Sequence, residues 1–356
     1  MNTSDYNIIK QKIKNAATDF GFLEASIANV KISLDAQTKY TQWLNSADVG
    51  DMTYLEKQAT LKLNPDKLVD GTLSIICVKV PYLSENIITD KQRLNDANHA
   101  YISNYAVRED YHKVVKDQLH SYANYINQLL EDYNLSLKYR AFTDSAPVME
   151  VELAQNSGLG FRGKNTLLIH PKEGSFFFLG ELFTNLPLSA DDAMDNLCGS
   201  CTKCLDVCPT KAFSAPYVLD ATKCISYLTI ENKSSIPIEY RKLIGNRIYG
   251  CDDCQLFCPW NKFSKLSSIT KFKVNQKLYN LTLIDAFKLD FTQWTELATA
   301  TPIARIGYLG WLRNVAVALG NTQSSLEVIQ TLMLHKDHDS PMIREHVAWA
   351  LSQHQK

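Results

Sequence analysis

The chain has 356 residues, of which 45% are apolar and 21% are charged, and its formal net charge at pH 7 is -1. This length allows two or three domains with buried cores, and the charge balance gives no overall attraction to nucleic acid or to membranes. The N-terminus lacks the basic start and apolar core of a signal peptide, and no apolar run is long enough to span a membrane. We therefore expect a cytoplasmic monomer with no membrane partner.

Three helices are expected in the first 190 residues. Apolar residues recur at helical spacing over residues 9–20, which predicts an amphipathic first helix ending at Gly21. The same spacing over residues 115–130 predicts a second, longer helix. A third is expected over residues 147–156, where Pro147 favours a helix start.

Strand patterns alternate with these helices. The apolar run 74–80, bounded by Gly71 and Pro81, predicts a buried strand. Its Cys77 is expected to be a small core residue and no metal ligand. Further strands are expected at residues 166–169 and 175–179, so this region mixes α and β structure.

Three glycines, Gly158, Gly160 and Gly163, spell GxGxxG. A dinucleotide-binding fingerprint follows a strand and opens a helix. Here the glycines follow an expected helix and lead into an expected strand. We therefore expect a loop in which the backbone approaches another segment closely.

Eight of the nine cysteines fall between residues 198 and 258. The first run, CxxCxxCxxxCP, is typical of bacterial ferredoxins and contains Cys198, Cys201, Cys204 and Cys208. The second run, CxxCxxxCP, is one thiolate short and contains Cys251, Cys254 and Cys258. Cys224 lies between the runs and is the candidate for the missing ligand.

In two-cluster ferredoxins the fourth cysteine of each run ligates the cluster of the other run. This rule predicts one [4Fe-4S] cluster on Cys198, Cys201, Cys204 and Cys258. It predicts a second cluster on Cys208, Cys224, Cys251 and Cys254. Structural zinc is the alternative, but zinc sites favour separated CxxC pairs and give the Cys-Pro endings no role.

The last eighty or so residues are helical and repetitive. The segments RNVAVAL and EHVAWAL lie 32 residues apart, with Gly320 as a stop signal after the first and Ser340-Pro341 as a start signal before the second. They predict a short HEAT-like helical pair. Such a pair forms either a binding surface or a helical cap without a ligand, and the sequence leaves both open.

Asp144 is placed at the end of an expected strand, just before the helix that Pro147 starts. Capping of that helix is the ordinary role of an aspartate at such a position. A carboxyl whose pKa is raised by burial would instead supply a proton in a reduction. On the residues alone, capping is the expected role.

The order of these motifs resembles the epoxyqueuosine reductase family. The resemblance rests on DSAPVMEVELAQNSGLGFRGKNTLLIHP, CGSCTKCLDVCPTKAF, Cys224 and CDDCQLFCPWN, and it extends through GDMTYLEK and YAVREDYHK into the C-terminal helices. It implies a multidomain α+β and α/β fold with three parts. These are a cobalamin-binding catalytic domain over residues 1–190, a two-cluster ferredoxin-like domain over 191–270 and a HEAT-like helical domain over 271–356.

The resemblance also implies an activity. Members of the family reduce the epoxide of epoxyqueuosine in the anticodon of tRNA to give queuosine, with electrons passing from the clusters to cobalamin. A low-potential electron donor is therefore an expected partner, together with tRNA. The proton donor of the family falls on Asp144. Cobalamin contacts are expected from Asp144 and from Tyr111, His112, Lys164 and Asn165.

The tRNA phosphates would require basic side chains on the protein surface. The residues that we expect to serve are Arg241, Lys242, Arg247, Arg305, Arg313 and Arg344. A solvated face is the alternative for the basic segment between Cys224 and Cys251. Three other kinds of protein fit parts of the pattern: a reductive dehalogenase-like enzyme, a simple electron carrier and an adaptor whose clusters are structural.

Overall fold

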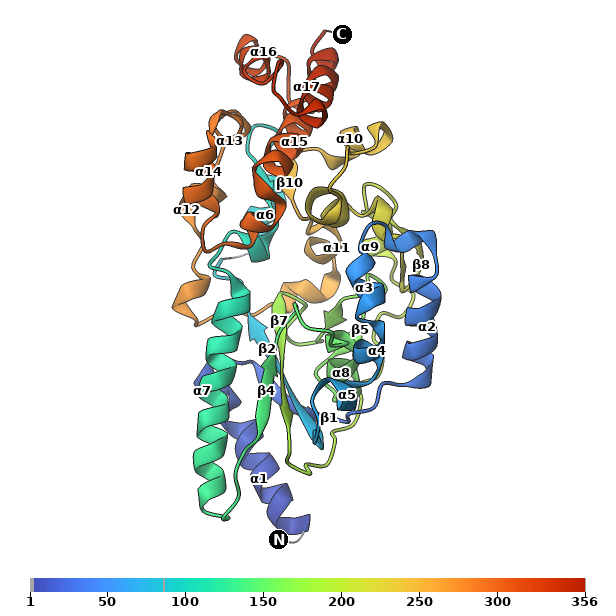
Figure 1. Ribbon diagram of the computed structural model, residues 1–356, viewed down its shortest axis with the longest axis vertical. Coiled ribbons are helices and arrows are strands. Elements are labelled where there is room, and N and C mark those ends of the chain that lie inside the picture. The colour runs from blue at the N-terminus through green and yellow to red at the C-terminus, as the bar shows by residue number, and fades with distance from the viewer. Residues whose placement is uncertain (1–2, 86, 356) are drawn as a thin grey trace.

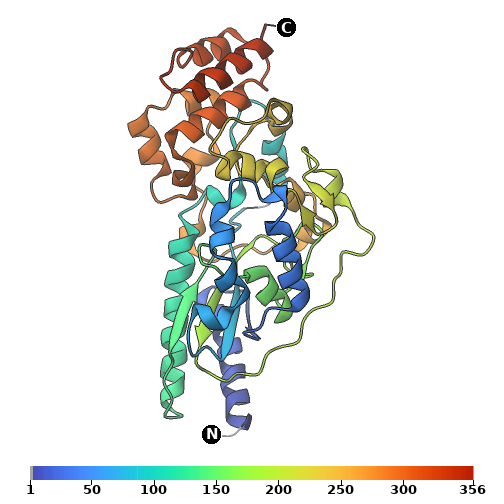
Figure 2. The same ribbon diagram turned by 45° about the vertical axis from the view of Figure 1, so that its right-hand side comes forward.

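The computed structural model describes residues 3–85 and 87–355 of an elongated molecule (Figure 1). The two ends of the chain lie at opposite ends of the long axis, with the first helix at one end and the last helix at the other. The cysteine-bearing segment lies beside the middle of the molecule, between the N-terminal sheet and the C-terminal helices (Figure 2). Among the described residues, no helix combines the length and the apolar character needed to cross a membrane.

A four-stranded antiparallel sheet forms the centre of the N-terminal part. Its strand order is β1-β2-β7-β4, with β1 at Glu24–Ala28, β2 at Ser74–Pro81, β7 at Phe177–Thr184 and β4 at Tyr139–Phe142. Every residue of β2 is buried, which confirms the strand expected over 74–80. A strand buried on both faces requires helices on both sides of the sheet.

Those helices form two layers. One face of the sheet packs against α1 (Thr3–Ala16) and α7 (Tyr111–Glu131), which confirms the two expected amphipathic helices. The other face packs against α8 (Glu150–Asn156). The short helices of this part are α2 (Leu34–Leu44), α3 (Thr53–Lys57), α4 (Ala59–Leu63), α5 (Pro65–Leu68) and α6 (Ile87–Leu94).

Alternation along β2 explains how one strand serves both layers. Ile76, Val78 and Val80 belong to the core beneath α1 and α7, whereas Ile75 and Cys77 belong to the core beneath α8. Successive side chains of a strand point to opposite faces, so an apolar run without polar interruptions suits both. Cys77 is fully buried, as expected of a core residue.

Two expected strands differ from the structure. Only Leu168–Ile169 (β6) is extended within the expected strand 166–169, and it pairs with Phe161–Arg162 (β5). Thr166 has a φ of +68°, a left-handed conformation that a regular strand does not contain. The strand expected at 175–179 begins at Phe177 and continues to Thr184, because it pairs with β2 over eight residues.

The cysteine-bearing segment consists of short elements. They are α9 (Lys203–Asp206), β8 (Phe213–Ala215), β9 (Val218–Leu219), a π-helical turn (Tyr227–Glu231), α10 (Ile238–Ile244), β10 (Arg247–Tyr249) and α11 (Asp253–Leu256). Strand β10 runs parallel to β3 (Tyr101–Ile102), which belongs to the first half of the chain. This pairing attaches the cysteine-bearing segment to the N-terminal part.

The C-terminal helices share a core with residues from both preceding parts. They are α12 (Gln276–Tyr279), α13 (Leu283–Lys288), α14 (Phe291–Ala298), α15 (Gly307–Leu319), α16 (Leu326–Met333) and α17 (Pro341–Gln353). The repeated segments fall on α15 and α17, which pack against each other. Ile102 and Val107 of the first half and Ile248 of β10 enter the same core.

The GxGxxG segment is a loop, as expected. Gly158 has a φ of +81°, and a Cβ atom there would lie 2.5 Å from the carbonyl oxygen of Asp192. At Gly160 a Cβ atom would lie 2.7 Å from the carbonyl oxygen of Ile169. These glycines allow two backbone segments to approach closely, and they form no nucleotide-binding turn between a strand and a helix.

Replacement of Gly158 by alanine should therefore lower the thermal unfolding midpoint more than replacement of Gly71. Both glycines have a positive φ, +81° and +76°, so the backbone penalty is similar, but no atom lies within 4 Å of a Cβ at Gly71. The additional clash at Gly158 should destabilise the fold by about 1–3 kcal/mol. Equal midpoints for the two anaerobically purified variants would contradict this account of the loop.

Candidate functional site

A cavity of about 420 Å³ lies between the sheet and the cysteine-bearing segment. One wall comes from β7 and its neighbourhood and is aromatic, with Tyr82, Phe177 and Phe178. Asp144 projects into the cavity from the loop that follows β4. The cavity therefore brings a carboxyl group, an apolar wall and the cysteine-bearing segment together.

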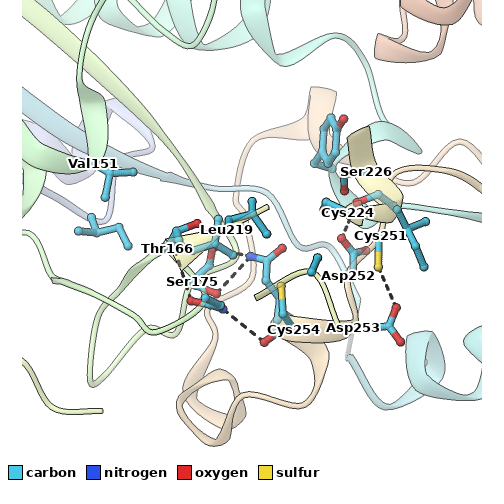
Figure 3. A pocket seen from close by; sticks show the side chains of 18 of the residues that line it. Val151, Thr166, Ser175, Leu219, Cys224, Ser226, Cys251, Asp252, Asp253 and Cys254 are labelled. Atoms are coloured by element: carbon cyan, nitrogen blue, oxygen red, sulfur yellow. Dashed lines mark hydrogen bonds between the residues drawn. The ribbon is translucent and has the colours of Figure 1, made fainter. Parts of the chain in front are cut away.

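Four cysteines line this cavity: Cys208, Cys224, Cys251 and Cys254. In Figure 3, Cys224, Cys251 and Asp252 gather at one end of the cavity, whereas Val151 lies at the other end. Cys224 comes from outside both CP-terminated runs, and Cys208 is the last cysteine of the first run. These four cysteines, which the ferredoxin rule predicts to hold one cluster, therefore share one cavity.

The other four cysteines surround a separate cavity of about 190 Å³, lined by Cys198, Cys201, Cys204 and Cys258. Cys201 is the one exposed residue among the eight cysteines of the two groups. Trp260 lines the same cavity as Cys258. Because Cys201 is exposed, the group that contains Cys198 lies nearer to solvent than the group that contains Cys208.

The electrostatics of the thiols reflect this crowding. Burial, with the neighbouring Cys258 and Cys198 thiols as the next causes, raises the pKa of Cys204 to about 11. Burial also raises the pKa of Cys254, with the Cys224 thiol as the next cause. Four thiols that each disfavour ionisation of the others form a stable group of thiolates only around a positive charge, such as that of a bound metal centre.

Asp252 connects the second cysteine run to the first half of the chain. Its buried carboxylate accepts hydrogen bonds from the Tyr101 hydroxyl at 2.9 Å, from the Asn104 amide at 2.6 Å and from the Ser103 hydroxyl. The next residue, Asp253, forms a buried ion pair with Arg247 at 2.7 Å. These contacts fix the turn that presents the second run to the cavity.

Asp144 is held by side chains from the start of α7. The Tyr111 hydroxyl donates a hydrogen bond to its carboxylate, and His112 Nε2 lies 3.2 Å from the same oxygen. His112 Nδ1 lies 2.7 Å from the carboxylate of Asp110, the residue that caps α7. Asp144 itself is the second residue after β4 and does not cap α8. The N-cap residue of α8 is Met149, which makes no side-chain capping hydrogen bond.

The pKa of Asp144 is shifted in the direction opposite to that of a carboxyl whose pKa is raised by burial. Burial acts to raise the pKa of Asp144, but hydrogen bonds from His112 and Tyr111 outweigh it, and the pKa is lowered. Burial acts to lower the pKa of His112, but hydrogen bonds to Asp110 and Asp144 raise it to about 9. At neutral pH the proton of this pair therefore resides on the imidazole.

The structure separates the residues expected to contact a cofactor. Tyr111, Asp144 and Asn165 line the larger cavity. His112 does not line it and contacts Asp144 from behind. Lys164 lies at the smaller cavity, where its amine donates to the carbonyl oxygens of Gly199 at 2.7 Å and Cys201 at 2.9 Å.

Two further acids lie behind Asp144, and the sequence analysis missed both. Glu150 lines the cavity and accepts a hydrogen bond from the Asp144 amide. Glu181 lies in β7 with no exposed surface. A glutamate within the apolar segment FFFLGELF was the available signal, because a charged residue is rarely buried without a specific role.

Three of the six basic residues expected to contact phosphates are buried, so that expectation is wrong for them. Arg241 pairs with Glu345 at 2.6 Å, and Arg247 pairs with Asp253. Arg313 donates to backbone carbonyls, among them that of Asn232 at 2.7 Å. The residues that remain accessible are Lys242, Arg305 and Arg344.

Known proteins match this chain over almost its whole length. Residues 62–145 match the family model "Epoxyqueuosine reductase QueG, DUF1730", and residues 197–261 match that of the 4Fe-4S double cluster binding domain. The epoxyqueuosine reductase of Pseudomonas aeruginosa is 42% identical over 97% of this chain and 94% of its own length.

Solved structures agree. The structure of an epoxyqueuosine reductase with an epoxyqueuosine-modified tRNA-Tyr stem loop has a TM-score of 0.85 and 25% identity, and the match covers 99% of this chain and 91% of that one. The Bacillus subtilis epoxyqueuosine reductase, solved with its catalytic aspartate loop swung out of the active site, has a TM-score of 0.82 and 25% identity, with 98% and 91% covered. With these relatives and the cavity that joins Asp144 to the cysteines, the chain belongs to the epoxyqueuosine reductase family.

Proposed function

We propose that this protein reduces the epoxide of epoxyqueuosine in tRNA to the alkene of queuosine. The conversion consumes two electrons and two protons and releases one water molecule. The observation that carries the proposal is the larger cavity, which is lined both by a four-cysteine group and by Asp144, the contact of His112. Electrons and protons can meet at one substrate there.

The double-cluster domain supplies the electrons. We assign one [4Fe-4S] cluster to Cys198, Cys201, Cys204 and Cys258 and the other to Cys208, Cys224, Cys251 and Cys254. The grouping of the cysteines around two cavities supports this assignment. Because Cys201 is exposed, the first group is the entry point for a low-potential donor, and the second faces the substrate.

Cobalamin is the cofactor that the larger cavity fits. Its aromatic wall, with Tyr82, Phe177 and Phe178, would suit a flat macrocycle. Tyr111 and Asn165 are positioned to contact the cofactor. Bound cobalamin would supply reducing power directly at the epoxide, which one-electron clusters do not provide.

Asp144 is the acid that acts on the epoxide oxygen, with His112 as the store of its proton. The imidazolium contacts the Asp144 carboxylate, so a proton can move to Asp144 as negative charge develops on the departing oxygen. Asp110 holds His112 in the required orientation. Tyr111 fixes the carboxylate that delivers the proton.

The modified base must leave the anticodon stack to reach this cavity, which requires recognition of RNA shape and of single-stranded bases. Lys242, Arg305 and Arg344 remain the candidates for phosphate contacts. The α15–α17 pair provides the HEAT-like surface that would support the stem loop. A division of the chain into catalytic, ferredoxin-like and HEAT-like domains follows the same proposal.

The function is tested by anaerobic conversion of epoxyqueuosine to queuosine in tRNA, measured by mass spectrometry with reconstituted protein and a low-potential reductant. We expect conversion only when cobalamin is present. The Asp144→Asn variant should bind clusters and cobalamin with unchanged spectra and convert at most a trace of substrate. Full turnover by this variant would remove Asp144 from the acid role.

Cysteine replacements test the ligand assignment. Cys258→Ala should lose the same cluster as Cys198→Ala, although the two residues lie in different runs, and each should retain about half of the iron. Cys77→Ala should retain all of the iron, since Cys77 lies in the apolar core beneath α8. Iron content and electron paramagnetic resonance of the reduced proteins measure the outcome. Loss of different clusters in the two variants would contradict the crossed assignment.

The rate should fall as the pH rises through about 9, because His112 then loses the proton that its raised pKa retains at lower pH. In His112→Gln the rate should be lower and its decline should begin at a lower pH. His120→Gln is the matched control, since His120 lies on the same helix and contacts Tyr139 instead. Single-turnover rates of prereduced protein across pH 6–10 measure both, and identical pH profiles would exclude His112 as the proton store.

A further inference from the structure

Glu181 is a buried acid without a conventional partner. Its side chain lies in the central strand β7 with no exposed surface. Among the described residues, no amide, hydroxyl or amine donates a hydrogen bond to either of its carboxyl oxygens. A buried carboxylate in this situation would be strongly destabilised, so another group must satisfy it.

The group within reach is the carboxyl of Glu150. This residue is the first of α8, which packs against β7, and its carboxyl lies within hydrogen-bonding reach of the Glu181 carboxyl. The same Glu150 carboxyl accepts a hydrogen bond from the backbone amide of Asp144 at 2.5 Å. One side chain thus links the buried strand to the loop that carries the acid.

Two carboxyl groups in contact inside a protein must share a proton, since a pair of carboxylates would repel at short range. Burial raises the pKa of Glu181 well above its ordinary value, and the Glu150 charge raises it further. Burial and the Asp144 charge raise the pKa of Glu150 to about 8. The pair therefore holds at least one proton at neutral pH, which gives Glu181 a donor role.

The groups around the two glutamates do not supply a positive charge that would allow both carboxyls to ionise. The Lys62 amine stabilises the charge on Glu150, but burial lowers the pKa of Lys62 itself. The Cys77 thiol lies opposite Glu181 in the sheet register, and burial keeps it neutral by raising its pKa. Asp144 adds a third acid, which opposes ionisation of both glutamates.

Asp144 needs support of this kind because of its backbone. Its φ is +53°, in the left-handed region that residues with a side chain rarely adopt. Tyr111 and His112 hold its carboxylate, whereas Glu150 holds its amide. Without the contact to Glu150, the backbone would relax and move the carboxylate away from its position in the cavity.

We propose that Glu150 and Glu181 are positioning residues, a proton-sharing carboxyl pair that keeps Asp144 in its cavity-facing conformation. The pair consumes no proton in the reaction, and its proton stays within the hydrogen bond. The proposal rests on the proposed function only where it treats Asp144 as the acid. It extends the set of residues needed for turnover to the centre of the sheet.

Two substitutions at Glu181 separate hydrogen bonding from packing. Glu181→Gln retains the shape and supplies an amide donor to Glu150 that does not titrate. Glu181→Leu retains a similar volume but supplies no donor. Hydrogen exchange of peptides spanning residues 143–150, followed by mass spectrometry, should be several-fold faster in Glu181→Leu than in wild type and near wild type in Glu181→Gln. The kcat of Glu181→Leu should fall at least tenfold with KM little changed, and Glu181→Gln should recover most of it.

Infrared difference spectra provide a direct signature of the shared proton. Wild-type protein at pH 7 should show the carbonyl stretch of a protonated carboxylic acid, which Glu181→Gln should lack. Glu152→Gln is the control on the same helix, because the Glu152 carboxylate accepts hydrogen bonds from Ser33 at 2.7 Å and Asn156 at 2.9 Å. The band should persist in that variant.

The proposal is overturned if the band is absent from wild type, or if Glu181→Leu, with intact cluster spectra, shows wild-type exchange and rate. A Glu181→Gln variant as impaired as Glu181→Leu would also overturn it, since a hydrogen-bond donor to Glu150 would then not be enough to position Asp144. Exchange and infrared spectra do not depend on turnover. If Asp144→Asn keeps its activity while the exchange results hold, the acid role fails and the carboxyl pair stands.

Discussion

The arrangement of the molecule depends on how the eight cysteines are divided. Each cavity takes cysteines from both CP-terminated runs, so the segment from residue 198 to 258 must fold back on itself before either group is complete. The second group is then fixed against the first half of the chain by the buried Asp252 carboxylate and by the pairing of β10 with β3. This constraint brings the second group of cysteines to the cavity beside β7.

In the proposed function, the same cavity handles electrons at one end and protons at another. Cysteines form one end, and Asp144 with its neighbours from α7 and α8 lies on the side of the sheet. Hydrogen bonds from His112 and Tyr111 lower the pKa of Asp144, so in the proposed function the proton is stored on His112, which contacts the Asp144 carboxylate. With the proton stored on His112, contacts from Tyr111 and His112 would hold the Asp144 side chain in place while its charge changes.

Local patterns in the sequence predicted much of this fold. The strand at residues 74–80 and the helix over residues 115–130 follow from apolar periodicity. The cysteine spacing divides the eight thiols between the two cavities that they line, although their ligand role stays a prediction. Contacts between distant segments were not predictable. Arg241 is buried because Glu345 lies beside it, 104 positions later, and the charge of Asp144 depends on His112. Nothing in the periodicity of β7 indicates that Glu181 meets Glu150.

The most direct test of the account is anomalous X-ray diffraction from crystals of anaerobically reconstituted, cobalamin-loaded protein, with data collected at the iron and cobalt edges. The account predicts iron at both four-cysteine groups and cobalt in the larger cavity, on the side of the second group that faces Asp144. Cobalt outside that cavity would contradict it. So would iron at only one group in protein whose iron content shows full loading.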